Sequence, residues 1–404
     1  MPPPNPWLHR FAVLTAAATF LLLGVGGLVT SKGAGMAVPD WPTSYGYNMF
    51  ALPFTFWKGG ALYEHAHRLA GAGVGLLTTI LALWLWLAES RRWVRWLGVI
   101  GFVAVVLQGV LGGLRVVWFK DEIGIFHATL AQLFLVLTCA LALFTSRWWK
   151  QLPSFMPRDC QTRRVAPIAP QAASSGSTGA HGLTGPTSPN GSRKQELNCS
   201  RNLRGFVLAT TLLVLGQLIL GAMMRHQHAG LAIPDFPLAY GKLWPAMDAD
   251  SVVRYNQQRL EVEAANPITA FQIGLQMVHR LMAVAILICV GTIAWQARRW
   301  SLCFSAPGVD HNLIVGLQRL AFAWFGLIFV QIALGAWTIW SNKAADVTTA
   351  HALLAALSLV TGALWCIISF RRPVTQTGSK FVPAHAFGLG AGESGTETAA
   401  MLNN

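Results

Sequence analysis

The segment GMAVPDWPTSYG at residues 35–46 recurs as GLAIPDFPLAYG at residues 230–241. Glycine, proline, aspartate, an aromatic residue, proline, tyrosine and glycine occupy the same places in both copies. Three further matches follow in the same order: His67-Arg68 with His279-Arg280, Gln108-x-x-Leu111-Gly112 with Gln331-x-x-Leu334-Gly335, and His127-Ala128 with His351-Ala352. Matches that keep their order along a chain indicate an internal duplication.

The composition around these motifs is that of a membrane protein. Of the 404 residues, 53% are hydrophobic and 11% charged, whereas an ordinary soluble domain has roughly 25% charged residues. Eight apolar stretches reach the ~20 residues needed to cross a bilayer; they lie at 11–30, 69–88, 94–114, 124–146, 205–224, 270–297, 317–340 and 346–370. We therefore expect an all-α integral membrane protein with eight transmembrane helices in two tandem four-helix bundles.

The duplication also predicts the domain organisation. Each half holds an even number of spans, so the repeats run in the same direction, unlike the inverted repeats of many transporters. We expect an N-terminal bundle at 1–150, a flexible cytoplasmic linker at 151–202, a C-terminal bundle at 203–372 and a disordered tail at 373–404. The linker and tail are rich in small and polar residues and lack the apolar surface that would offset their ordering entropy.

The formal net charge of +14 is explained by topology. A nucleic-acid-binding protein concentrates its basic residues on one face of a soluble module, so no nucleic acid partner is expected here. Of the 30 Lys and Arg residues, 19 fall on the side that holds both termini, and positive residues mark the cytoplasmic side. Both termini are therefore predicted to be cytoplasmic, with the loops near 31–63, 115–123, 225–267 and 341–346 outside. The short segment before the first span leaves no room for a transit peptide and favours a bacterial plasma membrane.

Four histidines belong to the repeated pattern, and each lies near the outward end of an apolar span: His67, His127, His279 and His351. Ionisable groups inside spans are rare and usually functional. The two histidines of one half lie on helices two apart, which can face each other across a four-helix bundle. Two imidazoles without a third His or Cys ligand fit the axial ligation of a haem iron better than tetrahedral zinc. The alternative is that they only form hydrogen bonds between helices.

Neighbouring residues allow two interpretations each. Four glycines near the histidines either leave room for a flat macrocycle or allow two helices to pack closely. They are Gly71, Gly73, Gly75 and Gly112. Arg68 and Arg280 are candidates to bind the propionates of a haem or to reach lipid headgroups.

The other histidines are set aside. His65 is two residues from His67 and points to another side of the helix, while His226 and His228 lie in an outer loop. The remaining four are expected to be solvated on the cytoplasmic side: His9, His181, His311 and His385.

The two halves differ beside the first histidine. Glu64 precedes His67 by three residues, whereas Gln276 stands at that place before His279. Glu64 shares a helical face with His67, where burial would suit it to proton transfer. The alternatives are an ion pair with Arg68 or a carboxylate solvated at the helix mouth. We infer that the first half is reactive and the second is an electron-relay or structural haem site.

The motif Glu-x-x-His-Arg at 64–68, the later histidines and the duplication together resemble the haem A synthase family, over residues 10–150 and 203–370. The resemblance implies an oxidoreductase that converts haem O to haem A for terminal oxidases by two successive hydroxylations of the C8 methyl, followed by loss of water to leave a formyl group. It implies haem b held by His279 and His351, a haem O substrate site at His67 and His127, and a catalytic role for Glu64. The implied partners are haem O, an unidentified electron donor and the lipid bilayer, with a haem O synthase and a second copy of the chain as candidates.

This chain lacks the cysteine pair that some members carry in an outer loop. Three cysteines lie in spans and three in cytoplasmic segments, so no disulfide is expected: Cys139, Cys289 and Cys366, and Cys160, Cys199 and Cys303. The alternative function is a quinol-linked electron-transfer subunit with two permanent b haems and no essential carboxylate. A third interpretation, a transporter or scaffold without haem, is disfavoured by the parallel duplication and the paired histidines.

Overall fold

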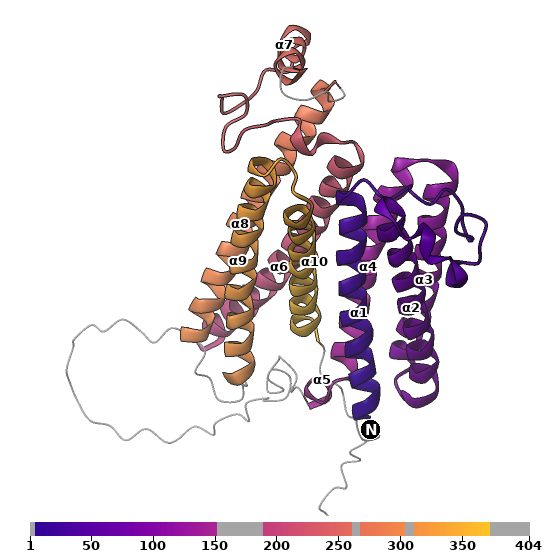
Figure 1. The fold of residues 1–404 in the computed structure, drawn as a ribbon. Coiled ribbons are helices and arrows are strands. Elements are labelled where there is room, and N and C mark those ends of the chain that lie inside the picture. The colour runs from indigo at the N-terminus through magenta and orange to yellow at the C-terminus, as the bar shows by residue number, and fades with distance from the viewer. Residues whose placement is uncertain (1–4, 152–188, 261–266, 304–310, 372–404) are drawn as a thin grey trace, which may run out of the picture.

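A computed structural model of the chain describes residues 5–151, 189–260, 267–303 and 311–371 (Figure 1). Within these ranges eight helices are long and apolar enough to cross a membrane, and no β-strand is formed. The eight helices are α1 (Pro6–Ser31), α2 (Gly59–Ala88), α3 (Arg92–Trp118), α4 (Asp121–Thr145), α6 (Pro189–His226), α8 (Ala270–Cys303), α9 (His311–Trp340) and α10 (Ala345–Ser369). The prediction of an all-α membrane protein with eight spans is confirmed.

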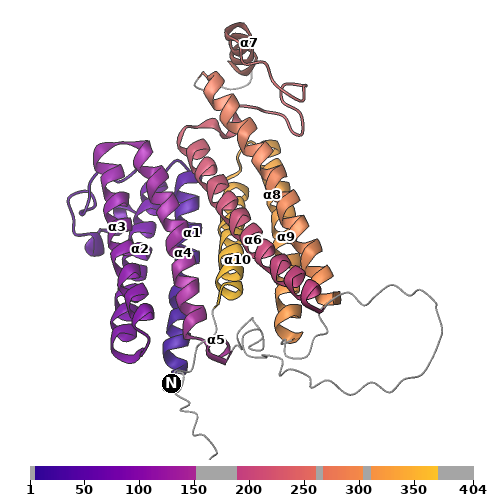
Figure 2. The same ribbon diagram turned by 180° about the vertical axis from the view of Figure 1, so that it is seen from behind.

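The helices form two groups of four. In the first group α1 packs on α2, α2 on α3, α3 on α4, and α4 returns to α1, which closes a ring. The second group closes in the same way through α6, α8, α9 and α10. The groups meet along α1, α4, α6 and α10, as the views from both sides show (Figures 1 and 2). Helices α2 and α4 are therefore diagonal in the first ring, and α8 and α10 are diagonal in the second.

The connections place the two repeated segments at the same end of the molecule. The α1–α2 loop contains two short 3-10 helices, η1 (Met49–Ala51) and η2 (Phe54–Phe56). The α6–α8 connection contains η4 (Ala229–Leu231) and a longer helix, α7 (Ala249–Leu260), which projects beyond the second group (Figure 1). The short helix α5 (Arg147–Gln151) and the beginning of α1 lie at the opposite end.

Local sequence explains where several of these helices begin and end. The Asn5 side chain accepts hydrogen bonds from the backbone nitrogens of Trp7 and Leu8, and Pro6 follows it, which is a favourable start for α1. Helix α4 has acidic residues in its first turn, where they complement the helix dipole. Helix α3 ends at Phe119, whose φ of 53° is left-handed and cannot continue the helix.

The repeated loops are held in the same way. The hydroxyl of Tyr45 donates to the carbonyl oxygen of Ala37 at 2.6 Å. In the second half the hydroxyl of Tyr240 donates to the carbonyl oxygen of Ala232. Gly46 and Gly241 have φ values of 76° and 75°, a left-handed conformation that glycine adopts without a steric penalty. Corresponding residues thus occupy corresponding places in the two halves.

The predicted domain boundaries stay predictions. Residues 152–188 of the predicted linker and 373–404 of the predicted tail lie outside the described residues. Helix α6 begins at Pro189, within the segment 151–202 that the sequence assigns to the linker.

Candidate functional site

The four repeated histidines come together in two pairs. His67 is on α2 and His127 on α4, while His279 is on α8 and His351 on α10. Each pair therefore joins the diagonal helices of one ring. The members of a pair are close enough to interact electrostatically. All four imidazoles lie inside the bundles and still retain accessible surface.

Each imidazole lies against a glycine of a neighbouring helix. His67 contacts Gly26 on α1, and His127 contacts Gly112 on α3. A Cβ added to these glycines would stand 2.9 Å and 3.1 Å from the imidazole Cε1. In the second half the contacts are equivalent, at 3.5 Å and 3.2 Å: His279 with Gly221 and His351 with Gly335. The absent side chains let the rings approach the neighbouring backbone.

A pair of hydrogen bonds then orients one histidine in each half. The Nδ1 of His127 lies 3.1 Å from the carbonyl oxygen of Gln108, and the Gln108 Nε2 donates to the His127 carbonyl at 2.8 Å. His351 and Gln331 repeat this arrangement at 3.0 Å and 2.8 Å. Since a carbonyl only accepts, Nδ1 carries the proton and Nε2 keeps its lone pair. This is the tautomer in which histidine binds a metal through Nε2.

The other histidine of each pair has an unsatisfied nitrogen. The Nδ1 atoms of His67 and His279 are buried and have no hydrogen-bond partner among the described residues. Buried polar atoms are normally paired, so an unpaired imidazole within electrostatic reach of a second imidazole fits a missing ligand. In the described part of the chain, no three His, Cys, Asp or Glu side chains gather as metal ligands. The residues present fit the axial ligation of a haem, whose porphyrin supplies the other ligands.

The glycines of α2 do not make a close helix contact. A Cβ added at Gly71, Gly73 or Gly75 would meet no atom within 4 Å. The interpretation of these three as a helix-packing surface is therefore wrong, because no atom of another helix lies against them. Gly112 does pack closely, against the ring of His127.

The two arginines after the histidines hold the outer loops. The Nη1 of Arg68 donates to the carbonyls of Asp40 and Thr43 at 2.7 and 3.0 Å, and its Nη2 donates to that of Val38 at 3.0 Å. Arg280 donates to the carbonyls of Leu238 and Asp235 at 2.9 and 2.7 Å. These donors are directed to the protein backbone, and the predicted role of both arginines in binding a cofactor stays a prediction.

Glu64 and Gln276 occupy equivalent places beside these arginines. Glu64 is 4% exposed, and its Oε2 accepts from the backbone nitrogen of Val38 at 2.9 Å. Its Oε1 forms an ion pair with Arg68 at 2.7 Å. The Oε1 of Gln276 accepts from the backbone nitrogen of Ile233 at 2.7 Å. The Glu64 carboxylate is therefore buried and forms the ion pair with Arg68 that the sequence analysis gave as an alternative. The Gln276 amide makes the equivalent contact with its loop but carries no charge.

The remaining histidines are not members of the two pairs. His65 packs edge-on against Trp57, with ring centroids 4.8 Å apart. The expectation that His226 lies in an outer loop is wrong, because α6 extends to this residue and its buried ring packs against Gly124 of α4. Its Nδ1 lies 3.8 Å from the Oδ1 of Asp121. His9, expected to be solvated, is partly exposed, and its Nδ1 bonds to the carbonyl of Ala142 at 3.0 Å where α1 begins against the end of α4. Of the others, His181 and His385 lie outside the described residues, and the His311 side chain is not described.

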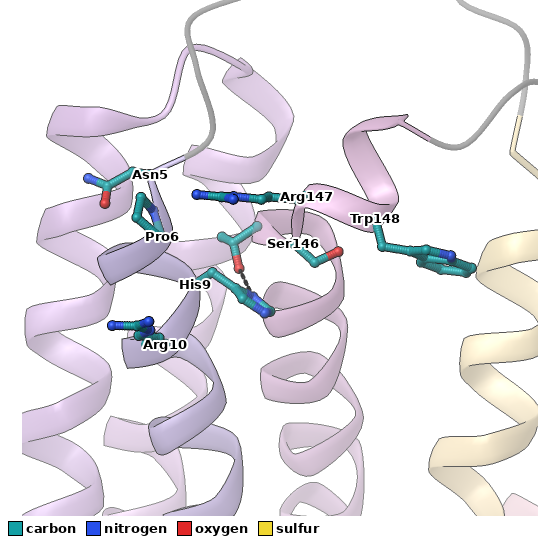
Figure 3. A pocket seen from close by; sticks show the side chains of 8 residues that line it. Asn5, Pro6, His9, Arg10, Ser146, Arg147 and Trp148 are labelled. Carbon is teal, nitrogen blue, oxygen red and sulfur yellow. Dashed lines mark hydrogen bonds between the residues drawn. The ribbon is translucent and has the colours of Figure 1, made fainter.

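A cavity of about 370 Å³ adjoins His9 (Figure 3). It lies at the end of the bundle opposite the four repeated histidines, so it is separate from their site. Its lining comes from the beginning of α1, the end of α4 and α5: Asn5, Pro6, His9, Arg10, Thr145, Ser146, Arg147 and Trp148.

Sequence reasoning missed part of the histidine environment. Gly26 and Gly221 were not singled out, and neither was Gln217, whose Nε2 donates to the carbonyl of His279 at 2.9 Å. The available signal was the pattern Gln-x-x-Leu-Gly, which occurs at 217–221 as well as at 108–112 and 331–335.

Comparison with known proteins gives a consistent assignment. The sequence model of the COX15-CtaA family, described as cytochrome oxidase assembly protein, matches residues 9–362. The chain is 24% identical to the heme A synthase of Geobacillus kaustophilus over 351 residues, which cover 85% of this chain and 86% of the relative. It is also 24% identical to the heme A synthase of Caulobacter vibrioides over 395 residues, covering 89% and 95%. Since the match spans all eight transmembrane helices, the chain belongs to the COX15-CtaA family of cytochrome oxidase assembly proteins.

Proposed function

We propose that this chain is a haem A synthase, an oxidoreductase that converts the C8 methyl of haem O to a formyl group. Two successive hydroxylations would give a gem-diol, which loses water. The observation that carries the proposal is the pair of neighbouring imidazoles in each four-helix group. One has its Nδ1 bonded to a backbone carbonyl, and the other has a buried Nδ1 without a partner among the described residues. The names of the relatives supply the reaction class.

The two pairs are assigned different tasks. His279 and His351 would hold haem b as the resident cofactor, and His67 and His127 would bind the haem O substrate. The support for this division is the buried charge of Glu64, which occurs in the first half only. When bound, haem b supplies a redox centre that passes electrons one at a time.

The protein's own residues position and protect the reacting groups. Gln108 and Gln331 hold the rings of His127 and His351 in the tautomer that leaves Nε2 free. The apolar helices around each pair exclude water, which strengthens the electrostatic interactions inside.

Glu64 is the candidate proton carrier. Its carboxylate lies one helical turn before His67, with Arg68 bound to Oε1 and the Val38 nitrogen bound to Oε2. Either oxygen can accept a proton when the ion pair opens. General acid or base catalysis by such a group contributes about 10²- to 10⁴-fold in rate.

The surroundings of the enzyme are part of the proposal. The chain is an integral membrane protein. We place it in a bacterial plasma membrane with both termini in the cytoplasm and both histidine pairs toward the outer surface. An electron donor is required, and a haem O synthase or a second copy of the chain would be a partner in the same bilayer.

Co-expression with a haem O supply, followed by chromatography of the extracted haems, tests this function. We expect haem b together with haem O or haem A. Haem b alone, at two equivalents per chain, would instead indicate the quinol-linked electron-transfer subunit. Purified protein without a Soret band would leave only a protein that binds no haem.

A further inference from the structure

Three of the four histidine-bearing helices are tied to a neighbouring helix in the same way. The Nε2 atoms of Gln108, Gln217 and Gln331 each donate to the backbone carbonyl of a histidine, at 2.8, 2.9 and 2.8 Å. The carbonyls are those of His127, His279 and His351. Each glutamine precedes by four residues the glycine that touches the same histidine ring. The pattern Gln-x-x-x-Gly thus forms a seat that holds both the ring and the main chain of its histidine.

The fourth seat lacks its glutamine. Gly26 touches the ring of His67 as the other glycines touch theirs, but the residue four places earlier is Leu22. Leu22 occupies the place in the first half that Gln217 has in the second, since Gly26 corresponds to Gly221. No side chain of the described residues donates to the His67 carbonyl, so α2 carries its histidine without this tether.

The missing hydrogen bond to the His67 carbonyl affects how strongly the pair of His67 and His127 can hold a ligand. Hydrogen bonds between helices inside a membrane meet little competition from water. In the second half both histidine helices are tethered at the level of the ligand, so either ring can retreat only after a hydrogen bond breaks. In the first half α4 has this tether to a neighbouring helix. Beside His67, α2 is held only through the outer loop, by the bonds of Glu64 and Arg68.

We propose that Gln217 is a positioning residue that makes the second pair a retaining site, and that Leu22 makes the first pair an exchanging site. The inference rests on the proposed function, in which a cofactor stays bound while a substrate enters and a product leaves. A leucine in the first seat lets α2 relax and release the modified haem. A glutamine in the second keeps the cofactor in place.

The test is the rate at which bound haem transfers to apomyoglobin from detergent-solubilised full-length protein, with haem b loaded at the second pair and haem O at the first. A His67→Ala background confines the haem to the second pair, and a His279→Ala background confines it to the first. Gln217→Leu is measured in the His67→Ala background, and Leu22→Gln is measured in the His279→Ala background. Leu21→Gln is the matched control, because Leu21 is 67% exposed on the adjacent face of α1. Thermal unfolding of the haem-free proteins is followed in parallel.

We expect Gln217→Leu to speed release from the second pair by about threefold to fivefold, the factor corresponding to one interhelical hydrogen bond. Leu22→Gln should slow release from the first pair by a similar factor, while Leu21→Gln leaves it unchanged. A slower release cannot result from a damaged fold, so this variant separates positioning from mere stability. Unchanged release in both variants, or equal effects of Leu22→Gln and Leu21→Gln, would overturn the inference alone. If the parent retains no haem in either background, the proposed function fails as well.

Discussion

The two four-helix groups share one frame, and two of the positions at which they differ bear directly on their histidines. Both place a histidine from each of two diagonal helices against glycines, and both fasten the outer loop with an arginine. The first group carries Glu64 and Leu22 where the second carries Gln276 and Gln217. The first therefore has a buried carboxylate and lacks a tether between helices, and the second has the tether and no carboxylate at that place. A duplicated frame can thus supply two sites of similar shape and assign them different tasks through one or two side chains.

The largest effect is expected from removing the charge of the first half. Gln276 shows that an amide fits this place and keeps the loop contact, so Glu64→Gln should fold and bind haem as the parent does. Haem A formation should fall by about 10²- to 10⁴-fold. The measurement is the haem A yield per bound haem. A variant that forms haem A at the parent rate would remove Glu64 from the chemistry.

The arginines that follow offer a comparison of stability between the halves. Arg68→Ala leaves the buried Glu64 without its cation, which costs about 3–5 kcal/mol. Arg280→Ala loses hydrogen bonds to two carbonyls and the contact with the Phe236 ring but leaves no buried carboxylate unpaired, which costs about 1–3 kcal/mol. Unfolding in detergent measures both losses. The double variant Arg68→Ala, Glu64→Gln should behave like Arg280→Ala, and equal losses in the two single variants would contradict the buried ion pair.

The glycine seats should respond alike in both halves. A Cβ at Gly112 or Gly335 would press on the Cε1 of His127 or His351, so Gly112→Ala and Gly335→Ala should each weaken haem binding at their own pair by about tenfold. Gly109→Ala and Gly326→Ala are controls on the same two helices, because an added Cβ there meets nothing within 4 Å. Haem titration of the apoprotein gives the affinities. Loss of affinity in the controls as well would mean that the ring contacts are not responsible.

The smallest effect concerns the outer loops and pH. Burial raises the pKa of Asp40, but hydrogen bonds from Thr43, Gly46 and Tyr45 outweigh it and hold that pKa below 3.8. A lowered pKa in the folded state means that the carboxylate stabilises the fold above pH 3.8 and loses this contribution as the pH falls through the folded-state value. Asp40→Asn should cost about 1 kcal/mol at neutral pH. The difference from the parent should shrink below pH 3.8 in unfolding measurements, and a constant difference would refute the assignment.

Much of the fold could be predicted because its causes are local in the sequence. Apolar stretches of membrane length and the repeated loop motif were enough to place eight spans. The four histidines could be singled out because ionisable residues are conspicuous in apolar helices.

The details that escaped prediction depend on packing between helices. The spacing of Glu64 and Arg68 allows an ion pair, but only the fold shows that Val38 donates to the same carboxylate. The hydrogen bond of His9 to α4 could not be predicted because no local pattern reveals that α1 begins beside the end of that helix. Gln217 looks like any polar residue in a span until the carbonyl of His279 is found beside it.

The central claim is that each pair of histidines binds its own haem and that only the first pair binds the substrate. Its most direct test is to extract and identify the haems of His127→Ala and His351→Ala after co-expression with a haem O supply. The account predicts haem b without haem O or haem A in His127→Ala, and loss of haem b in His351→Ala. Loss of the same haem in both variants, or of none in either, would contradict it.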